Sequence, residues 1–445
     1  MVKRQTDTIF ALSTAQGKSG VAVIRISGPS SMEALRLLGV KDDISPRVAH
    51  CRLLHDSKGR LIDQAVVLYF PKPGSFTGED VVELQVHGSR AVIRLLYEEL
   101  QTFIRIAEPG EFSLRAYLNG KIDLTRAEGI ADLINAETDA QLRQALAQST
   151  GKLEKQYDQW RSILLDILTD LEACIDFPED VDSSCVLGGI YNNIEKLCAV
   201  LGQYLNDGHR GERLRSGVRV VILGPPNAGK STLFNSIARR NAAIVSEHPG
   251  TTRDVLEVAI DIGGYPYIVL DTAGIRESCD GIEQEGIKRA KMAAEEADIK
   301  IVMYPYETTS MQGIDPICDL QDEKTILVLS KADNVDLPES KCIDGKEFHL
   351  ISVHQDRGIG KLLTLIQEKS RDSFPQEGDV FITSQRHRSH LQKALQAVDA
   401  VSKGMPIEIV AEHLRIAAYE LGRVTGAVSG DDILDDIFSK FCIGK

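Results

Sequence analysis

The amino-acid sequence lacks long apolar runs, paired cysteines and an excess of positive charge. No apolar stretch among the 445 residues approaches the roughly 20 that a membrane-spanning helix needs. The start, "MVKRQTDTIFALSTAQGKSG", has no long apolar core, so we expect no signal peptide. The eight cysteines are scattered without CxxC spacing, which argues against a zinc site and against a disulfide framework. Together these absences predict a reducing, cytoplasmic setting.

The charge balance argues against non-specific nucleic-acid binding, and the last residues argue against a lipid anchor. A formal net charge of −14 disfavours non-specific binding to nucleic acid, so any RNA needs a local basic patch or a more basic partner. The ending "FCIGK" places Cys442 fourth from the carboxyl end, as in prenylated chains. However, Gly444 stands where an aliphatic residue belongs, and the preceding run is acidic rather than basic. We therefore expect no lipid anchor.

Three sequence patterns predict the domain organisation. Residues 1–119 mix short β-branched runs with turn clusters such as "PKPGSFTGED", which predicts a compact α+β domain. Residues 217–373 alternate apolar strands with helical stretches, which is typical of a doubly wound parallel sheet. Residues 120–216 and 374–445 are helical in pattern, so the α/β domain is expected to be inserted into one helical domain. One apolar stripe, interpreted as bundle core, comprises Leu153, Tyr157, Trp160, Leu164, Leu168 and Leu171.

A phosphate-binding motif opens the α/β region. The strand "VRVVILG" runs into "GPPNAGKST", which matches G-x-x-x-x-G-K-[ST] between a strand and a helix. The backbone amides of such a loop cradle phosphate at a helix N-terminus. Lys230 is expected to reach the β- and γ-phosphates, and the Ser231 hydroxyl to ligate Mg²⁺. The candidate nucleotide contacts here are Asn227, Ala228, Gly229, Lys230, Ser231 and Thr232.

Two further motifs predict that the nucleotide is GTP. "LSKAD" puts a carboxylate, Asp333, at a strand end, where it can accept from two adjacent guanine donors. The later "ISV" loosely matches a turn that lines guanine sites. Most GTPases have Asn where this chain has Ser330, so we expect a weakened contact and modest affinity. The candidate base contacts are Ser330, Lys331, Asp333, Ser352 and Val353.

The residues that respond to the γ-phosphate lie between these motifs. "DTAG" (Asp271, Thr272, Ala273 and Gly274) supplies an aspartate for the Mg²⁺ shell and an amide for the γ-phosphate. In "HPGTTRD", Thr252 is placed like a switch threonine that completes the Mg²⁺ shell. Ras-like enzymes orient the attacking water with a Gln after DxxG, but this chain has Ile275 there. The residues alone leave that role open among Glu277, Asp280, Glu283 and Glu285.

Over nearly its full length the sequence resembles the MnmE (TrmE) family of tRNA-modification GTPases. The flanks carry the resemblance: "DTIFALSTAQGKSGVAVIRISGP", "SFTGEDVVELQVHG", "PGEFSLRAYLNGKIDLTRAEGIADLI" and "FCIGK". It implies a homodimer with a folate-binding N-terminal domain, working with the flavoprotein MnmG (GidA) in a heterotetramer or larger complex. The implied reaction adds a carboxymethylaminomethyl-type group to C5 of the wobble uridine of certain tRNAs.

The resemblance also implies roles for particular residues. The cofactor 5-formyltetrahydrofolate, or a related tetrahydrofolate, would contact Arg25, Glu83, Lys121 and Lys445. Cys442 would lie near the reacting carbon as a catalytic nucleophile, a redox group or a packed side chain, and the sequence leaves these roles open. Two G domains would meet across their nucleotides, with K⁺ in place of an arginine finger. Glu283 would orient the attacking water through a second water. The implied K⁺ ligands are Asn227, Ser246, His248 and Thr251, and the implied loop contacts to the nucleotide are Ser246, Glu247, His248, Pro249, Gly250, Thr251 and Thr252.

Rival hypotheses and departures remain at this point. An Era-like regulatory or ribosome-assembly GTPase shares the nucleotide motifs, but its flanks bind RNA or ribosome instead of taking part in chemistry. The acidic charge and the absence of an RNA-binding signature disfavour it. A membrane-linked GTPase fails because no anchor is evident. Ser330, Val353 and the stretch "LDDIF" depart from the family pattern.

Overall fold

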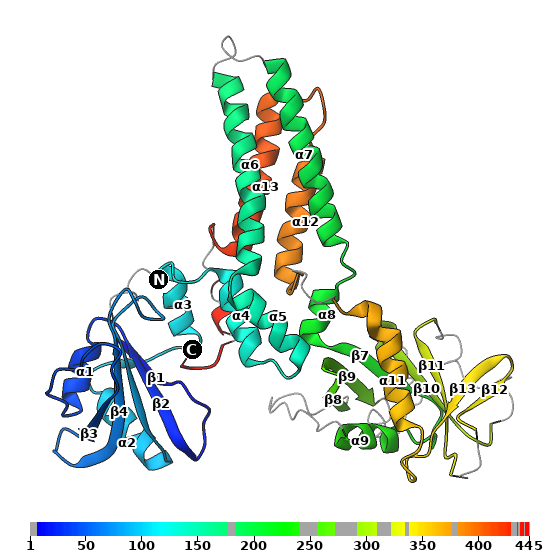
Figure 1. The fold of residues 1–445 in the computed structure, drawn as a ribbon, viewed down its shortest axis with the longest axis horizontal. Helices are drawn as coiled ribbons and strands as arrows, with labels where there is room; N and C mark the ends of the chain where they lie inside the picture. Colours follow the sequence, from blue (N-terminus) through cyan, green and yellow to red (C-terminus); the bar gives the residue numbers. More distant parts are fainter. Residues whose placement is uncertain are drawn as a thin grey trace, which may run out of the picture. The chain divides into compact units, whose positions relative to one another are not determined.

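The computed structural model describes residues 7–176, 183–240, 256–271, 292–308, 322–333, 338–375 and 381–428, together with residues 434, 437–439 and 441–444. It divides into two compact units, coloured along the chain in Figure 1. The first unit comprises residues 1–131, 148–163 and 418–445, and the second comprises residues 132–147 and 164–417. Helices α4, α5, α6 and α13 each contribute residues to both units.

The first unit is built on a six-stranded sheet in the order β3-β4-β5-β2-β1-β6. Its strands alternate in burial because successive side chains point to opposite faces. In β1, Phe10 and Leu12 join one apolar cluster, whereas Ile9 and Ala11 join another with Phe112. The strands are β1 (Ile9–Leu12), β2 (Ser19–Ser27), β3 (His50–His55), β4 (Leu61–Phe70), β5 (Val81–Gly88) and β6 (Arg105–Ile106).

Short helices cover this sheet and lead into the helical region. The helix α2 begins where Ser89 caps it by accepting a hydrogen bond from the Val92 N–H group, and its buried Leu96 and Leu100 pack on the sheet. Later in the chain, Phe438 and Phe441 pack with Leu124 of α4. The helices that begin in this unit are α1 (Ser31–Leu37), α2 (Arg90–Leu100), α3 (Glu111–Leu118), α4 (Leu124–Ile134) and α6 (Lys152–Asp176).

The second unit contains a seven-stranded sheet in the order β12-β13-β11-β10-β7-β9-β8. Its five inner strands are parallel, and β8 and β12 pair antiparallel at the two edges. Separate apolar clusters lie on the two faces, with α9 and α11 contributing to one of them. The strands are β7 (Val218–Leu223), β8 (Leu256–Ile262), β9 (Tyr265–Asp271), β10 (Ile299–Pro305), β11 (Thr325–Ser330), β12 (Ser340–Ile343) and β13 (Lys346–Leu350).

This sheet has the doubly wound arrangement expected from the sequence. In such sheets, ligands bind outside the carboxyl ends of the strands, where the strand order reverses. Here β7 is that point, because its parallel neighbours β9 and β10 both follow it in the chain. The helices beside the sheet are α9 (Lys230–Arg240), α11 (Ile359–Ser370) and the 3₁₀ turn η4 (Arg371–Ser373).

Long helices precede and follow the α/β domain, as the insertion hypothesis requires (Figure 1). In α6 the predicted stripe, from Leu153 through Trp160 to Leu171, is buried. Arg388 at the start of α12 donates to Asp207 at 2.6 Å and to Glu212, so α12 is tied to the α7–α8 junction. No helix in the described part of the chain is long and apolar enough to cross a membrane. The remaining helices are α5 (Asp139–Ser149), α7 (Ser183–Leu205), α8 (Arg210–Ser216), α12 (Gln385–Asp399) and α13 (Ile407–Thr425).

Candidate functional site

The P-loop joins β7 to α9 at the carboxyl end of the parallel strands. Asn227 has φ +63° and Gly229 has φ +91°, so the loop contains two residues in the left-handed backbone conformation. Such alternation forms a concave nest of backbone N–H groups, and Asn is among the side chains that tolerate this conformation. A Cβ atom added at Gly224 would overlap the carbonyl oxygen of Met303, so only glycine lets the loop approach β10 so closely. The backbone therefore fits a phosphate group at the start of α9.

A buried cation and a buried carboxylate lie beside this loop. Lys230 is 7% exposed, and its ammonium group donates to the carbonyl oxygens of Gly224 and Pro225, each at 2.9 Å. Asp271 is fully buried at the end of β9, where it pairs in register with Ile222 of β7. The ammonium group suits phosphate oxygens, and the carboxylate suits the shell of a divalent cation. Ser231 and Thr232 are exposed in the first turn of α9.

Ser330 contacts the P-loop itself. It is 2% exposed at the end of β11, and its hydroxyl donates to the carbonyl oxygen of Ala228 at 2.5 Å. The same oxygen lies 3.2 Å from the carbonyl oxygen of Tyr304. Ser330 therefore braces the P-loop against β10 and β11, a role that the sequence motif did not suggest.

The two base-recognition motifs meet at the same end of the sheet. The hydroxyl of buried Ser352 donates to the Asp333 carboxylate at 2.5 Å. An ionised carboxylate has about four acceptor positions, so this bond leaves room for guanine donors. Lys331 is exposed with φ +60°, and Val353 is half-buried after Ser352. The structure thus brings "LSKAD" and "ISV" together, and their contact with guanine stays a prediction.

Several predicted site residues lie outside the described residues. These are the switch and loop candidates, the residues after Asp271, the water-orienting candidate and the last residue. They are Ser246, Glu247, His248, Pro249, Gly250, Thr251, Thr252, Thr272, Ala273, Gly274, Glu283 and Lys445.

A second constellation lies on the N-terminal sheet. Arg25 of β2 faces Glu83 of β5 in register, and its Nε donates to the Glu83 Oε1 atom at 2.9 Å. The Arg25 guanidinium lies 5.7 Å from the ring centroids of both Phe76 and Phe112. Lys121 donates from Nζ to the carbonyl oxygen of Pro73 at 2.9 Å, on the loop that also carries Phe76. A cation, a carboxylate and two aromatic rings are thereby assembled at one place.

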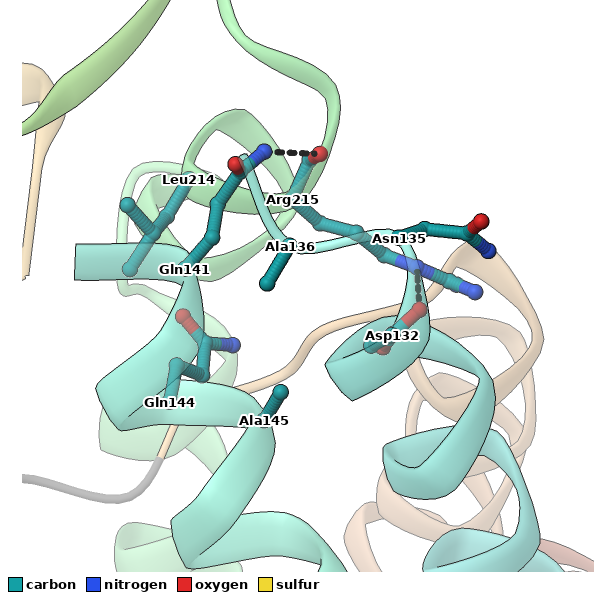
Figure 2. Close-up of a pocket in the computed structure, with 8 residues that line it drawn as sticks. All are labelled: Asp132, Asn135, Ala136, Gln141, Gln144, Ala145, Leu214 and Arg215. Carbon is teal, nitrogen blue, oxygen red and sulfur yellow. Dashed lines mark hydrogen bonds and ion pairs between the residues drawn. The ribbon is translucent and has the colours of Figure 1, made fainter. Parts of the chain in front are cut away.

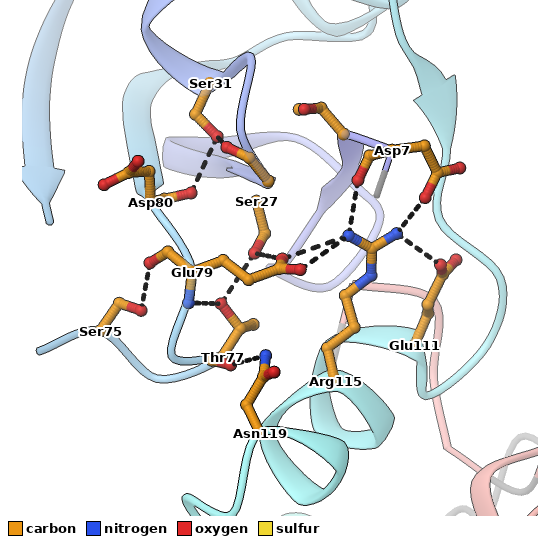
Figure 3. Close-up of polar contacts among 12 residues, drawn as sticks. Asp7, Ser27, Ser31, Ser75, Thr77, Glu79, Asp80, Glu111, Arg115 and Asn119 are labelled. Atoms are coloured by element: carbon orange, nitrogen blue, oxygen red, sulfur yellow. Dashed lines mark hydrogen bonds and ion pairs between the residues drawn. The ribbon is translucent and has the colours of Figure 1, made fainter. Parts of the chain in front are cut away.

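A partly buried ion network holds the segments that carry these rings (Figure 3). The guanidinium of Arg115 on α3 points between Asp7, Glu79 and Glu111, and donates to the Asp7 carboxylate at 2.7 Å and to Glu111 at 3.0 Å. Arg105 donates to the same Asp7 and Glu111 side chains. Burial alone would raise the pKa of Glu111, but the hydrogen bonds from Arg105 and Arg115 outweigh it and lower that pKa. The network fixes the Glu79 loop relative to α3.

Residues 441–444, here called the terminal segment, lie against this domain. The Gly110 N–H group donates to the Cys442 carbonyl oxygen at 3.4 Å, and the Ser13 hydroxyl donates to the Gly444 carbonyl oxygen at 3.0 Å. A Cβ atom at Gly444 would overlap the Leu12 carbonyl oxygen. Cys442 is exposed. The terminal segment therefore returns to the strand and helix that flank Arg25.

Sequence reasoning missed several residues of this second constellation. Phe76, Phe112 and Arg115 lie within the quoted stretches "SFTGEDVVELQVHG" and "PGEFSLRAYLNG". Their aromatic and basic side chains are visible in the sequence, but only the tertiary fold places the rings of Phe76 and Phe112 around the same Arg25 guanidinium. Spacing along the chain carries no signal for such a contact.

A polar cavity of about 180 Å³ lies between α4, α5 and α8 (Figure 2). The Arg215 side chain reaches Asp132 at 2.7 Å, and the Gln141 amide donates to the Arg215 carbonyl oxygen at 3.1 Å. Nearby, the Ala140 N–H group donates to the carbonyl oxygen of Gly264 in the β8–β9 turn at 3.1 Å. These contacts attach α5 to the α/β domain, so we interpret the cavity as part of that attachment.

Comparison with known proteins covers nearly the whole chain. Residues 124–442 match the family model described as the MnmE helical domain, and residues 8–121 match the GTP-binding protein TrmE N-terminus. The chain is 63% identical over 442 residues to the tRNA modification GTPase MnmE of Anaplasma marginale, covering 99% of this chain and 100% of that protein. It is 54% identical over 443 residues to the protein of the same name from Ehrlichia chaffeensis, covering 98% and 100%. A solved structure of Era with MgGDPNP and 16S ribosomal RNA nucleotides is 22% identical, with a TM-score of 0.27, covering 42% of this chain and 68% of that chain.

Proposed function

The chain belongs to the MnmE (TrmE) family of tRNA-modification GTPases, and we propose that its GTP hydrolysis supports addition of a carboxymethylaminomethyl-type group to C5 of the wobble uridine. The observation that most strongly supports the GTP-hydrolysing part of this proposal is the convergence of Lys230, Asp271 and the Asp333–Ser352 pair at one end of the sheet. These groups suit the phosphates, Mg²⁺ and guanine of GTP respectively. tRNA is the proposed substrate, and we assign the reaction to the cytoplasm, where tRNA is found.

Within the nucleotide site, each residue has a proposed task. The Lys230 ammonium group would exchange its loop carbonyls for β- and γ-phosphate oxygens, Ser231 and Thr252 would hold Mg²⁺, and Asp271 would hold the shell around it. The amide of Gly274 contacts the γ-phosphate. Ser330 acts through the P-loop, because its hydroxyl fixes the Ala228 carbonyl. The other proposed contacts to the nucleotide are the P-loop residues 227–232 and the loop residues 246–252.

Hydrolysis is proposed to depend on K⁺ and on a second G domain. The exposed left-handed Asn227 projects from the P-loop, which supports its assignment as a K⁺ ligand with backbone oxygens of Ser246, His248 and Thr251. A monovalent cation there would offset negative charge that develops during phosphoryl transfer. Glu283 orients the attacking water, since Ile275 has no polar group to do so.

The N-terminal constellation is proposed to bind 5-formyltetrahydrofolate or a related tetrahydrofolate. The guanidinium of Arg25 and the ammonium groups of Lys121 and Lys445 suit the glutamate tail of a folate, and the Glu83 carboxylate suits its guanine-like pterin edge. Phe76 and Phe112 support the assignment because flat rings pack on a pterin. Folate would supply the one-carbon unit when bound, and Cys442 would lie near the reacting carbon.

The proposed assembly is a homodimer with the flavoprotein MnmG (GidA) in a heterotetramer or larger complex. An Era-like regulatory or ribosome-assembly GTPase is the alternative. The family models match residues 8–121 and 124–442, which include the flanks, and this favours the modification enzyme.

GTP turnover in KCl and in NaCl tests the nucleotide part of the proposal. We expect strong stimulation by K⁺ and none in the Asn227→Ala variant, with GDP affinity retained. Equal rates in the two salts would overturn the K⁺ assignment, and hydrolysis of ATP at the same rate as GTP would overturn the guanine assignment.

A further inference from the structure

A cavity of about 650 Å³ lies at the amino-terminal end of β9, whereas the P-loop lies at the carboxyl end of the neighbouring parallel strand β7. It is lined by Tyr265 at the start of β9, by the end of α11 and η4, and by Arg210 at the start of α8. Asp271, at the other end of β9, is six residues from Tyr265, a distance of about 20 Å along an extended strand. The cavity is therefore separate from the nucleotide site.

Aromatic side chains form one wall of the cavity. The Tyr265 and Phe374 rings pack against each other in a tilted arrangement, with centroids 4.5 Å apart and planes at 34°, and Phe374 meets Tyr267 edge-on at 5.7 Å. Phe374 and Tyr267 are buried, whereas Tyr265 is half-buried and lines the cavity. The hydroxyl of Tyr267 shares a 2.6 Å hydrogen bond with Ser370, which fixes the wall from behind. A half-buried aromatic ring on a rigid wall is a surface on which a nucleic-acid base stacks.

The cavity is also lined by two arginines, Arg210 and Arg371. Arg210 donates from Nε to the Asp372 carbonyl oxygen at 3.0 Å, which anchors the side chain at the cavity. Within the described ranges, neither Arg210 nor Arg371 forms an ion pair. The other two arginines that follow Arg210 in α8 do form ion pairs. Arg213 pairs with Asp298 at 2.8 Å, and Arg215 pairs with Asp132 at 2.7 Å. In a chain with a net charge of −14, two such cations in one cavity are available to an anionic ligand.

Hydrogen-bonding groups complete the lining. Gln367 and the carboxylates of Glu368 and Asp372 also border the cavity. An amide offers both donors and acceptors, and a carboxylate accepts from base N–H groups or ribose hydroxyls. The carboxylates make the cavity a poor site for inorganic phosphate alone. Stacking, paired cations and acceptors together match one nucleotide.

We propose that this cavity binds one nucleotide unit of the tRNA substrate, with its base against Tyr265 and its phosphate between Arg210 and Arg371. The inference rests on the proposed function, because tRNA modification is what brings RNA to the chain. Its two guanidinium groups give this acidic protein a local contact for an RNA phosphate, while the carboxylates accept from the base or the ribose.

The test compares two full-length double variants that each remove two positive charges. Arg210→Ala/Arg371→Ala changes the cavity, whereas Lys361→Ala/Lys393→Ala removes exposed lysines of α11 and α12 outside it. Fluorescence anisotropy with labelled, unmodified tRNA is measured at several KCl concentrations. We expect the arginine variant to bind tRNA about 10-fold more weakly than wild type. The plot of the logarithm of affinity against the logarithm of salt concentration should become less steep by about 1 to 2. The lysine variant should stay near wild type in both respects.

Stacking and the source of the nucleotide are tested separately. Tyr265→Leu keeps an apolar side chain and should weaken tRNA binding about 10-fold by loss of base stacking.

Photo-cross-linking of 4-thiouridine-containing tRNA, in the complex with the flavoprotein, should label the peptide around Tyr265 or Phe374. GTP turnover should stay at the wild-type rate in all variants, which shows that they are folded. Binding of free uridine 5′-monophosphate is measured separately, with GDP filling the nucleotide site. This measurement shows whether the cavity binds a nucleotide that is not part of tRNA.

The outcomes separate the two claims. If wild type supports tRNA modification but the arginine and Tyr265 variants bind tRNA with unchanged affinity and salt slope, the cavity assignment is wrong and the proposed function stands. If the cavity binds the free monophosphate while tRNA binding is insensitive to the variants, the tRNA assignment is likewise overturned. If wild type neither binds nor modifies tRNA, the proposed function itself fails.

Discussion

The hydroxyl of Ser13 donates a 3.0 Å hydrogen bond to the carbonyl oxygen of Gly444, across 431 residues of sequence. Ser13 follows β1, whose Ala11 pairs with Arg25 in register. The contact therefore brings the terminal segment to the sheet that carries the Arg25–Glu83 pair. The residues of "FCIGK" that the structure describes therefore pack on the first domain, where the proposed folate site lies.

Deleting residues 442–445 should separate the two proposed activities. The segment contacts Ser13 and Gly110 of the first unit, whereas the P-loop belongs to the second unit. We expect tRNA modification to be lost and folate binding to weaken, while K⁺-stimulated GTP hydrolysis stays near wild type. A truncated chain that modifies tRNA normally would show that the segment is dispensable, and loss of GTP hydrolysis would indicate a structural role in the helical region.

Glu283→Ala should lower the kcat for GTP by about 100-fold, the usual size of effect for a group that assists proton transfer or orients water. Nucleotide affinity should change little, because the residue acts on the attacking water. The matched controls are Glu277→Ala, Asp280→Ala and Glu285→Ala, measured in the same KCl buffer. Near-normal turnover in Glu283→Ala, with a loss in one of the controls, would transfer the role to that residue.

Ser330→Ala should weaken GDP binding by about 5-fold. The substitution removes the donor to the buried Ala228 carbonyl oxygen, and a net hydrogen bond is worth about 1 kcal/mol. Ser330→Asn should instead tighten binding, since an amide can keep that donor and add a contact to the base. Calorimetric titration with GDP distinguishes these changes, and an alanine variant with wild-type affinity would remove Ser330 from the site.

The first domain should lose stability in acid. The pKa values of Glu111 and Asp7 lie below their ordinary values of 4.5 and 3.8, because hydrogen bonds from Arg105 and Arg115 outweigh burial. A lowered folded-state pKa contributes stability that is complete above the ordinary pKa and is lost as pH falls through the folded value. Thermal unfolding should therefore shift to lower temperature below about pH 4.5, and less steeply in Glu111→Gln than in the control Glu33→Gln. Identical pH profiles for the two variants would contradict this.

Local patterns predicted the parts of the site that are contiguous in sequence. The P-loop around Lys230, the place of Asp271 at a strand end and the two base-contact motifs each follow from the strand–loop–helix order of a doubly wound sheet. The hydrogen bond between Ser352 and Asp333, 19 residues apart, comes from the fold. The contact of Ser330 with Ala228 joins residues 102 positions apart, and no pattern in the sequence encodes it.

The first domain shows the same limit more strongly. The resemblance implied Arg25 and Glu83, but the rings beside Arg25 and the ion network around Arg115 depend on where one loop and one helix pack. The cavity beside Tyr265 likewise combines residues from α8, β9 and α11, so it exists only in the folded chain.

The most direct test of the central claim is nucleoside mass spectrometry of tRNA after reconstitution with the flavoprotein, folate, GTP and KCl. The account predicts a C5-modified wobble uridine with wild type. It predicts no modification with Arg25→Ala, which still hydrolyses GTP, and none with Lys230→Ala, which does not. Modification of the wobble uridine by the Lys230→Ala variant, or in the absence of GTP, would contradict the account.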